Sequence, residues 1–399
     1  MRVLILGGGI SGLSAAWFLK RKNPHARITL LEKSNRLGGW IATQRESGYL
    51  LEKGPRTFSS SRSPMLLDLI EELDLGSELI FSDPLAAKRY LWKEGQLRSL
   101  ASFWPLFLPA LIREPFIKPK SLEDESIYDF ASRRLGAQVA ETLFDPMTLG
   151  IYAGDIRKLS LRSCFPKLDE WERNKGSIVR GLFSEKKKKK GLFTLKNGMA
   201  SLIERLHSRL DIEILFDHEV KELREKAVLA KGQVFSADRI FCALPSPVIN
   251  RLLNGGFLSH SLSVVNLVYP RPVLPKAGYG YLIPSQEKQS LLGMIWDSSV
   301  FPQQNKGRET RLTAMVRFEE PDPIRAALQG GAFHLGIREE PSSFFLFQAQ
   351  EAIPQYLVGH SMKVQNFEKK HPSWTFLGNY LEGVSVEACI QRSFQKINI

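Results

Sequence analysis

The fold is decided by the stretch Val3-Leu-Ile-Leu-Gly-Gly-Gly-Ile-Ser-Gly12, near the start of the chain. Its apolar residues 3–6 predict a buried strand, the glycines at 7, 9 and 12 form a GxGxxG pattern, and residues 13–20 predict a helix. A second apolar run at residues 28–31 predicts a second strand, and Glu32 follows it directly. Strand, glycine turn, helix, strand and acid in this order are the fingerprint of a βαβ unit that binds a dinucleotide.

Each part of this fingerprint has a physical role. Gly7 permits a tight turn, Gly9 lets the backbone approach a pyrophosphate, and Gly12 lets the helix sit close to the sheet. The helix N-terminus offers N–H groups and the positive end of its dipole to the phosphates, and Glu32 can accept hydrogen bonds from ribose hydroxyls. We therefore expect the dinucleotide to contact Gly7, Gly8, Gly9, Ile10, Ser11, Gly12 and Glu32.

The 399 residues are enough for two or three domains with a large core. Cys164, Cys242 and Cys389 lie far apart without a metal-binding spacing, so we expect no metal site. An odd number of cysteines fits a reducing compartment better than a disulfide framework, which predicts a cytoplasmic protein with three buried thiols. The first core strand begins at Val3, which leaves no room for a signal peptide.

The net charge of +13 includes five consecutive lysines at residues 186–190. Nucleic-acid binding would need aromatic platforms or a known module, and the sequence shows neither, so it predicts no nucleic-acid partner. An anionic membrane surface or an anionic substrate is the preferred explanation. The apolar run at residues 100–112 is too short to span a bilayer. It suits either a segment in a bilayer interface, which predicts peripheral association with the inner face of the cell membrane, or a core helix. The sequence also leaves a homodimer open.

The residues after Glu32 narrow the cofactor. An Arg36-Leu-Gly-Gly-Trp40 turn follows, and then Tyr49-Leu-Leu-Glu-Lys-Gly-Pro55. This arrangement resembles the extended N-terminal signature of the amine oxidase-like FAD superfamily. A second fingerprint for a nicotinamide is absent from the sequence. FAD is therefore the expected cofactor.

The remaining pattern predicts an α/β protein with a discontinuous Rossmann-like FAD-binding domain, an α+β substrate domain and a helical membrane-associating insertion. The expected segments are 1–82, 191–257 and 356–399 for the FAD-binding domain, 83–190 for the insertion and 258–355 for the substrate domain. Within the insertion, residues 126–143 predict one amphipathic helix.

Several further segments resemble, in their order along the chain, the flavin-dependent protoporphyrinogen oxidase family. They include Gly54-Pro-Arg-Thr-Phe58, Asp145-Pro-Met-Thr-Leu-Gly-Ile-Tyr-Ala-Gly-Asp155, Leu292-Gly-Met-Ile-Trp-Asp-Ser-Ser-Val-Phe-Pro302 and Gly378-Asn-Tyr-Leu-Glu-Gly-Val-Ser-Val386. The resemblance implies the six-electron oxidation of protoporphyrinogen IX to protoporphyrin IX through one FAD, with oxygen as acceptor, in heme synthesis. It also implies that the flavin itself carries the chemistry.

The resemblance implies site residues beyond the fingerprint. Those for FAD are Lys33, Trp40, Gly54, Pro55, Arg56, Thr57, Val220, Asn379, Val384, Ser385 and Val386. Those for the substrate are Arg89, which would pair with a propionate, and the apolar Leu282, Ile295 and Met315, which would hold the macrocycle. The backbone around Gly150 to Gly154 is a further candidate, as a neighbour of the reactive carbon. An apolar slot with a guanidinium at its rim matches a wide macrocycle with carboxylates at one edge.

Three alternatives stay open. Coproporphyrinogen III carries two more carboxylates, which Arg56 or Lys167 could meet. Another flavoenzyme of the superfamily, such as an amine oxidase or a carotenoid desaturase, is the second alternative, and a non-catalytic binder with this fold is the third. The chain also departs from the family where Ser393 replaces a usual glycine, and its nearby end predicts a short last helix.

Overall fold

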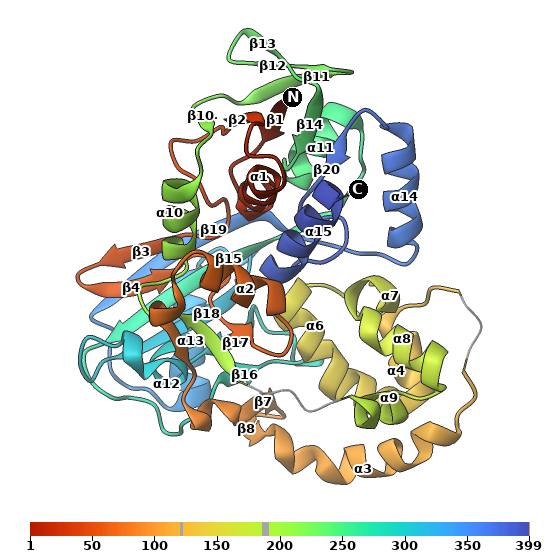
Figure 1. The fold of residues 1–399 in the computed structure, drawn as a ribbon. Helices are drawn as coiled ribbons and strands as arrows, with labels where there is room; N and C mark the ends of the chain where they lie inside the picture. The colour runs from red at the N-terminus through yellow and green to blue at the C-terminus, as the bar shows by residue number, and fades with distance from the viewer. Residues whose placement is uncertain (120–122, 186–190, 399) are drawn as a thin grey trace. The chain divides into compact units, whose positions relative to one another are not determined.

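The computed structural model describes residues 1–119, 123–185 and 191–398. The chain divides into two compact units (Figure 1). Unit 1 comprises Met1–Phe81, Lys189–Ser259 and Ser361–Ile399, and unit 2 comprises Ser82–Lys188 and His260–His360. The lysine run at residues 186–190 lies outside the described residues.

Unit 1 is built on a five-stranded sheet in which neighbouring strands are parallel. The central strand β1 is buried from Val3 to Leu6, because both faces of the sheet are covered. The predicted glycine turn leads into helix α1 (Ile10–Lys22), so the predicted strand–turn–helix unit is confirmed. In spatial order the strands are β10 (Glu213–Leu215), β2 (Arg27–Leu31), β1 (Arg2–Leu6), β14 (Arg239–Cys242) and β20 (Thr375–Phe376).

Two hydrophobic clusters cover the two faces of this sheet. Val3 and Ile5 of β1 point to helices, whereas Leu4 and Leu6 point to a small antiparallel sheet and two further helices. Helix α1 packs along α15, as Figure 1 shows. The first face has α1, α2 (Pro64–Glu72), α10 (Ala200–Arg209) and α15 (Val386–Asn398); the second has β11 (Val220–Arg224), β12 (Ala227–Ala230), β13 (Gln233–Ser236), α11 (Ser246–Leu253) and α14 (His360–Lys370).

Unit 1 also contains two smaller sheets, one of which joins segments that are far apart in the sequence. The short strand β9 pairs on both sides with strands from Met1–Phe81, which are distant from it in sequence. The first small sheet is the hairpin of β3 (Thr43–Glu46) and β4 (Tyr49–Glu52), and the second has the order β5 (Phe58–Ser59), β9 (Leu192–Leu195), β6 (Leu79–Phe81).

Unit 2 contains a seven-stranded mixed sheet. Strands β7 and β16 are parallel, and the pairs β16–β17, β17–β18 and β15–β18 are antiparallel. Residues 89–99 form two of its strands, although the sequence predicted a mostly helical region there. The order is β19 (Ser343–Pro354), β15 (Ser259–Tyr269), β18 (Thr310–Arg317), β17 (Leu291–Ile295), β16 (Gly280–Leu282), β7 (Arg89–Lys93), β8 (Gln96–Ser99).

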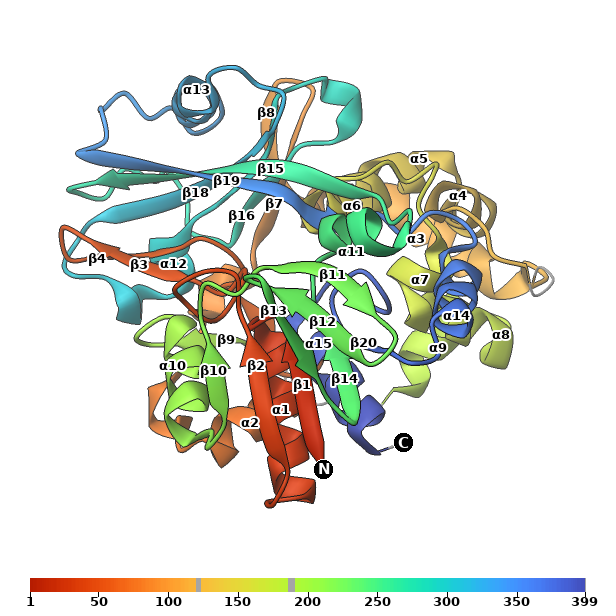
Figure 2. The same cartoon turned by 90° about the horizontal axis from the view of Figure 1, so that it is seen from above.

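Helix α13 (Pro323–Leu335) lies on one side of this sheet in Figure 2. Alternate strand residues, among them Tyr281 and Met294, form a hydrophobic core with it. The strand residues that alternate with these point to the other side of the sheet. There, Leu149 of helix α6 (Asp145–Tyr152) joins a smaller hydrophobic cluster. We call these two surfaces the α13 face and the α6 face of the sheet.

The helices of residues 100–185 differ in one respect from the prediction. The single helix expected over residues 126–143 is interrupted at Gly136, whose φ of +95° ends the first part. A short turn and a π-helical turn (Ala140–Phe144) continue it, so that prediction is wrong in its length. The α-helices of this region are α3 (Trp104–Arg113), α4 (Ile127–Leu135), α5 (Ala137–Val139), α6, α7 (Leu161–Cys164), α8 (Pro166–Lys175) and α9 (Ile178–Ser184).

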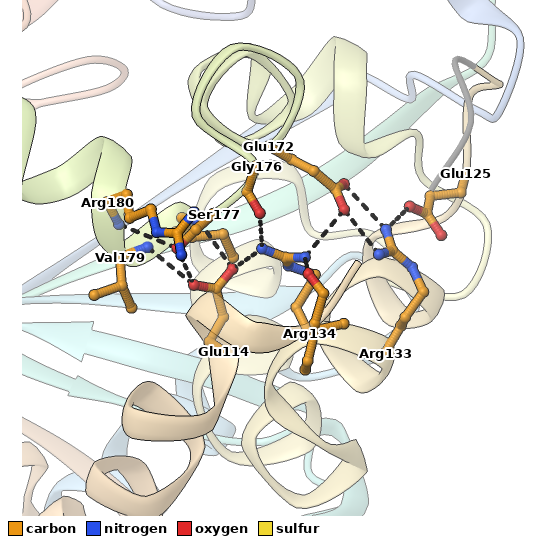
Figure 3. A network of polar contacts seen from close by, with 11 residues as sticks. Glu114, Glu125, Arg133, Arg134, Glu172, Gly176, Ser177, Val179 and Arg180 are labelled. Atoms are coloured by element: carbon orange, nitrogen blue, oxygen red, sulfur yellow. Dashed lines mark hydrogen bonds and ion pairs between the residues drawn. The ribbon is translucent and has the colours of Figure 1, made fainter. Parts of the chain in front are cut away.

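A buried ion-pair network holds the end of α3 (Figure 3). Glu114 follows α3 directly and pairs with Arg134 of α4, and neither side chain has any exposed surface. Burial alone would raise the pKa of Glu114, but hydrogen bonds from Ser177 and from the N–H groups of Ile178 and Val179, with the charge of Arg134, hold that pKa below its ordinary value. The network continues through Arg134–Glu172, Arg133–Glu172 and Arg133–Glu125.

Candidate functional site

The glycine-rich loop of unit 1 has the close approaches that the fingerprint predicts. Gly7 has a φ of +97° and donates its N–H to Leu31 O at 2.8 Å. A Cβ at Gly12 would lie 2.0 Å from Gly7 O, so only glycine fits there. These contacts press the start of α1 against the sheet, as the predicted role of Gly12 requires.

Space is open beside Gly9. A Cβ on this residue would meet no atom within 4 Å. Gly9 is the N-cap of α1 and offers no capping side chain, so the first N–H groups of Ile10, Ser11 and Gly12 point out of the helix without a side-chain acceptor. An open space in front of a helix N-terminus fits a phosphate group.

Glu32 joins three backbone segments near this loop. Its carboxylate accepts the Gly8 N–H at 2.8 Å and the Ser34 N–H at 2.9 Å. Its backbone oxygen accepts the His218 N–H at 2.9 Å, which brings the start of β11, with the buried Val220, close to it. A carboxylate has about four acceptor positions. After a further bond from the Ser34 hydroxyl, Glu32 keeps the capacity to accept a ribose hydroxyl.

The second glycine turn lies against the first. Gly38, with a φ of +102°, donates its N–H to Gly8 O at 2.8 Å, and a Cβ at Gly39 would lie 3.3 Å from the Gly9 Cα. Arg36 closes the turn by donating to Gly39 O at 2.8 Å. The structure thus brings together the two glycine motifs that the sequence singled out.

The other predicted FAD residues before residue 60 have different environments. Gly54 is packed so tightly that a Cβ would lie 2.0 Å from Trp40 O, whereas the Trp40 ring is exposed. Arg56 is buried and donates to Glu52 O at 2.8 Å, so its guanidinium has a structural partner. Lys33 is exposed, and Pro55 and Thr57 are half-buried.

The C-terminal part of the predicted set lies at the start of α15. Val384 and Ser385 precede this helix, Val386 is its first residue, and the Ser385 hydroxyl accepts the Ala388 N–H at 3.1 Å. Asn379 lies between β20 and α15 and is half-buried. These residues belong to unit 1, as the fingerprint does.

Ser393 has a clear place in the structure. Its buried hydroxyl lies 2.9 Å from both Ser11 O and Cys389 O, where it joins α15 to the first turn of α1. The prediction of a short last helix is wrong, because α15 spans 13 residues, the same length as α1. The thiols Cys164, Cys242 and Cys389 are all buried and unpaired in disulfides, as predicted.

In unit 2 the predicted substrate residues share the α6 face of the sheet. Arg89 is paired with Gly280, Gly280 with Ile295, and Ile295 with Thr313 across four neighbouring strands. Residues paired across strands point to the same face. Arg89 and Ile295 therefore lie in one row across the sheet, two strands and about 10 Å apart.

A second row on the same face holds the other two apolar residues. Leu282 is paired with Gly293, and Gly293 with Met315, and the Leu282 side chain lies over Gly293, because a Cβ there would be 3.0 Å from a Leu282 methyl carbon. Gly150 of α6 meets this row, because a Cβ there would lie 2.8 Å from a methyl group of Leu282. All five predicted substrate residues therefore belong to one part of unit 2.

Arg89 lies at the exposed end of its row. Its guanidinium carbon lies 5.1 Å from the centre of the Tyr279 ring, in cation–π range. Ile295, Leu282 and Met315 are half-buried. The face thus combines half-buried apolar side chains with one exposed cation at its edge.

Sequence reasoning missed a polar group in the first row. Thr313 is fully buried, and its hydroxyl lies 2.8 Å from Asn266 Oδ1 and 2.6 Å from Asp297 Oδ2. The signal in the sequence is an asparagine inside the apolar run Val264-Val-Asn-Leu-Val-Tyr269. A buried polar residue in such a run is uncommon enough to mark a site.

Comparison with known proteins places the chain in a family. Residues 10–326 match the family of flavin containing amine oxidoreductases. The chain is 32% identical to protoporphyrinogen oxidase from Bos taurus, over 98% of this chain and 97% of that protein. It is 27% identical to coproporphyrinogen III oxidase from Bacillus subtilis, over 98% of this chain and 96% of that protein. A solved structure from Exiguobacterium sp. 255-15 with a provisional protoporphyrinogen oxidase name has a TM-score of 0.87, with 25% identity over 100% of this chain and 98% of its own.

The chain belongs to the flavin-containing amine oxidoreductase family. It is an FAD-dependent oxidoreductase with the α/β fold that the fingerprint predicted. The open space at Gly9, the remaining acceptor capacity of Glu32 and the paired glycine turns fit this dinucleotide.

Proposed function

We propose that this protein oxidises protoporphyrinogen IX to protoporphyrin IX in heme synthesis, with oxygen as electron acceptor. Unit 1 is the FAD-binding part, and unit 2 holds the macrocycle. Support comes from the similarity to protoporphyrinogen oxidases along nearly the whole chain and from the α6 face of unit 2.

The α6 face is the observation that carries this proposal. A porphyrinogen is a wide apolar ring system with carboxylates on one edge. Leu282, Ile295 and Met315 offer half-buried apolar side chains on one face, and Arg89 offers a guanidinium at its border. A planar guanidinium matches a carboxylate with two parallel hydrogen bonds, so one propionate on Arg89 orients the ring on the face.

FAD, when bound, supplies the two-electron acceptor for each step. The chain's own residues then have three tasks. Arg89 binds the propionate, Leu282 and Met315 hold the ring, and Gly150 keeps the Leu282 side chain from being displaced.

Oxidation of two porphyrinogens tests the proposal. The purified protein is mixed with protoporphyrinogen IX or coproporphyrinogen III in air, and porphyrin fluorescence is recorded. We expect a higher kcat/KM for protoporphyrinogen IX. The similarity to the Bacillus subtilis coproporphyrinogen III oxidase supports the second substrate, and a reversed preference would establish it. A protein that carries FAD but oxidises neither would disprove the proposed activity, and one without FAD would favour a non-catalytic binder.

The assignment of the FAD residues has its own test. Gly9→Val places a side chain in open space, so we expect a normally folded protein that purifies without flavin. Gly12→Val is the contrast, because its Cβ would collide with Gly7 O and so disturb the fold itself. Released flavin and the circular dichroism spectrum are measured for both. Full FAD content in the Gly9 variant would refute the assignment.

We also propose that unit 2 associates with anionic membrane surfaces through α3. Among residues 1–119, 123–185 and 191–398, no helix is both long and apolar enough to cross a bilayer. Along α3, however, Trp104 is 55%, Leu108 53% and Ile112 63% exposed. Their spacing of four residues forms one stripe on the helix. Phe116, in the short turn that follows the helix, is 82% exposed.

Two observations support a membrane rather than a folding role for this stripe. Side chains exposed to this extent contribute little to the core. The buried Glu114–Arg134 pair fixes the end of the helix, so the stripe is held without its own burial. The net charge of +13 supplies the attraction to anionic lipid, where each basic residue near the surface is worth about 1 kcal/mol.

Liposome flotation tests this association. The double variant Trp104→Ser/Leu108→Ser should lower the membrane-bound fraction at least 10-fold, since each buried apolar side chain is worth about 1.5–3 kcal/mol. Val234→Ser, at an exposed apolar position of β13, is the control and should bind normally. Salt should weaken the binding to anionic vesicles. Absence of wild-type binding to both neutral and anionic vesicles would refute the proposal.

A further inference from the structure

A groove runs beside helix α13, which lies on the side of the seven-stranded sheet opposite to the α6 face (Figure 2). Its volume of about 700 Å³ is within the range of sites that bind small molecules. The groove is lined by α13 and the loop before it, by residues 289–291 at the start of β17, and by Trp92 of β7. All of these residues belong to unit 2, and none of them takes part in the proposed function.

His334 brings an unused hydrogen-bonding atom to this groove. The residue is 9% exposed and lines the groove, and its Nδ1 lies 2.9 Å from the buried Tyr281 hydroxyl. Among the residues that the structure describes, its Nε2 has no hydrogen-bond partner, yet this atom is not sealed from solvent. Because Nδ1 faces the core, Nε2 is the ring nitrogen that a ligand in the groove can reach.

The surroundings of His334 determine which nitrogen carries its proton. Burial lowers the pKa of His334 to about 4, so at neutral pH the ring is uncharged and has one N–H group. Within the described part of the chain the Tyr281 hydroxyl has no other hydrogen-bond partner, so it donates its proton to Nδ1. The imidazole proton is then on Nε2, which makes this atom an uncharged donor. A ligand at this place must bring an acceptor.

Aromatic side chains flank this donor. The Trp92 and His334 rings pack on each other with 4.1 Å between their centroids, and both residues line the groove. Phe333, the preceding residue of α13, also lines it and is 75% exposed. Flat apolar surface beside a single donor favours an aromatic ring that carries a hydrogen-bond acceptor.

Charged side chains of both signs lie at the other end of the groove. Arg325 is exposed, and its guanidinium forms no ion pair with any described residue. Glu320 is half-buried, and its Oε1 accepts the Asp322 N–H at 3.3 Å, which leaves Oε2 for a ligand. A guanidinium binds a carboxylate, and a carboxylate binds an ammonium, so the two side chains together match the head group of an amino acid.

The two ends of the groove are a suitable distance apart for such a ligand. Arg325 and His334 lie nine residues apart on α13, which is about 13 Å along the helix axis. An aromatic amino acid with a hydrogen bond at each end can bridge this distance. The groove therefore combines, in one ligand length, a charged end and an aromatic end with a donor.

We propose that this groove binds a small zwitterionic aromatic ligand, an amino acid with an acceptor on its ring. The ligand carboxylate pairs with Arg325 and its ammonium with Glu320. Its ring lies against Trp92, and the ring acceptor binds His334 Nε2. This site is on the sheet face opposite to the candidate substrate residues and is independent of the proposed oxidation of a porphyrinogen.

Isothermal titration calorimetry with four compounds tests this site. L-Tyrosine carries all three groups, L-phenylalanine lacks the ring acceptor, tyramine lacks the carboxylate, and 3-(4-hydroxyphenyl)propionate lacks the ammonium. We expect the purified holoenzyme to bind L-tyrosine with a Kd below about 1 mM. Each of the other compounds should bind about 3- to 10-fold more weakly, the effect of one hydrogen bond or one exposed ion pair.

Three variants assign the groups of the ligand to residues. Arg325→Ala should weaken L-tyrosine by a similar factor and leave tyramine, which has no carboxylate, unchanged. Glu320→Gln should weaken L-tyrosine and leave 3-(4-hydroxyphenyl)propionate unchanged. Arg338→Ala, at an exposed arginine just beyond the end of α13, is the matched control and should bind L-tyrosine normally. His334→Phe should lower the affinity for L-tyrosine to that for L-phenylalanine, and the two charge variants carry the test if it does not fold.

Three results would overturn the proposal. The first is that L-tyrosine at about 1 mM gives no binding heat with the wild-type protein. The second is that Arg325→Ala and Glu320→Gln bind L-tyrosine as the wild type does, which would place the binding elsewhere. The third is that the compounds lacking one group bind as tightly as L-tyrosine, which would refute the ligand class. Calorimetry does not measure porphyrinogen oxidation, so failure of this site and failure of the proposed function are separate results.

Discussion

The two faces of the seven-stranded sheet in unit 2 are made by the same strands and differ in almost every other respect. On the α13 face, Tyr281 and Met294 are buried in a hydrophobic core. On the α6 face, their direct neighbours Leu282 and Ile295 are only half-buried. One step along the chain therefore changes a side chain from scaffold to candidate site. The first face carries the buried core with α13, whereas the second presents half-buried apolar side chains.

Polar residues show the same contrast. On the α13 face, the Tyr281 hydroxyl and His334 Nδ1 are partners at 2.9 Å, and the His334 ring stacks on Trp92. On the α6 face, Arg89 is exposed and the Asn266 amide has one unpartnered atom. Trp296 on the α13 face also has a buried unpartnered atom, its Nε1, so an unpartnered atom alone does not mark a site. The exposed Arg89 beside half-buried apolar side chains is what distinguishes the α6 face.

The largest expected effect comes from substituting two methionines that lie on opposite faces of the sheet. Met294→Ala opens a cavity in the α13 core, so we expect a loss of about 2–5 kcal/mol in the free energy of unfolding with unchanged kcat/KM. Met315→Ala removes a half-buried side chain from the α6 face and should raise KM with a smaller loss of stability. Denaturant unfolding and steady-state kinetics are measured for both. Equal stability losses would show that the α6 face is also core.

Arg89 gives the next largest effect. Removal of a charge-assisted hydrogen bond costs about 1.5–3 kcal/mol, so Arg89→Ala should lower kcat/KM roughly 10- to 200-fold. Arg89→Lys should recover only part of this loss, because an ammonium lacks the planar fork. Arg98→Ala, at a half-exposed arginine of β8, is the control. A loss of FAD in place of activity would contradict the assignment of Arg89 to the substrate.

The stability of the protein should depend on pH through His334 on the α13 face. Burial lowers the pKa of His334 to about 4, below an unfolded value of about 6.5. Between these pH values the unfolded chain binds the extra proton, so stability falls as pH falls, by at most about 1.4 kcal/mol per pH unit. His334→Gln keeps an acceptor for the Tyr281 hydroxyl and should flatten this dependence. Urea unfolding at several pH values between 4.5 and 7 measures it, and parallel curves for both proteins would refute the prediction.

The smallest expected effect concerns Gly150. The Cβ that Gly150→Ala adds would lie 2.8 Å from the end of the Leu282 side chain, and this side chain can rotate away. We therefore expect a normal melting temperature and a KM changed by about threefold or less, because a small shift of one apolar contact is involved. An unfolded variant would show that α6 packs more rigidly on this face than the geometry indicates.

Much of unit 1 could be predicted from the sequence, because its signals are local. The strand, the glycine turn, α1 and Glu32 follow one another directly at the start of the chain, and each is specified by backbone conformation or by burial of neighbouring residues. The match of motif order along the whole chain then gave the family. Local signals were less reliable where a single residue ends a helix. Gly136 does this within the helix that was expected over residues 126–143.

By itself, then, the sequence determined the dinucleotide fold, its cofactor and the identity of the candidate substrate residues. Only the tertiary structure decided that Arg89, Ile295, Thr313 and Asn266 form one row, since this depends on the register of strands that are far apart in the sequence. A one-residue shift in any of these pairings would move a side chain to the opposite face. No local pattern specifies such long-range pairing, because it is set by the packing of the whole sheet.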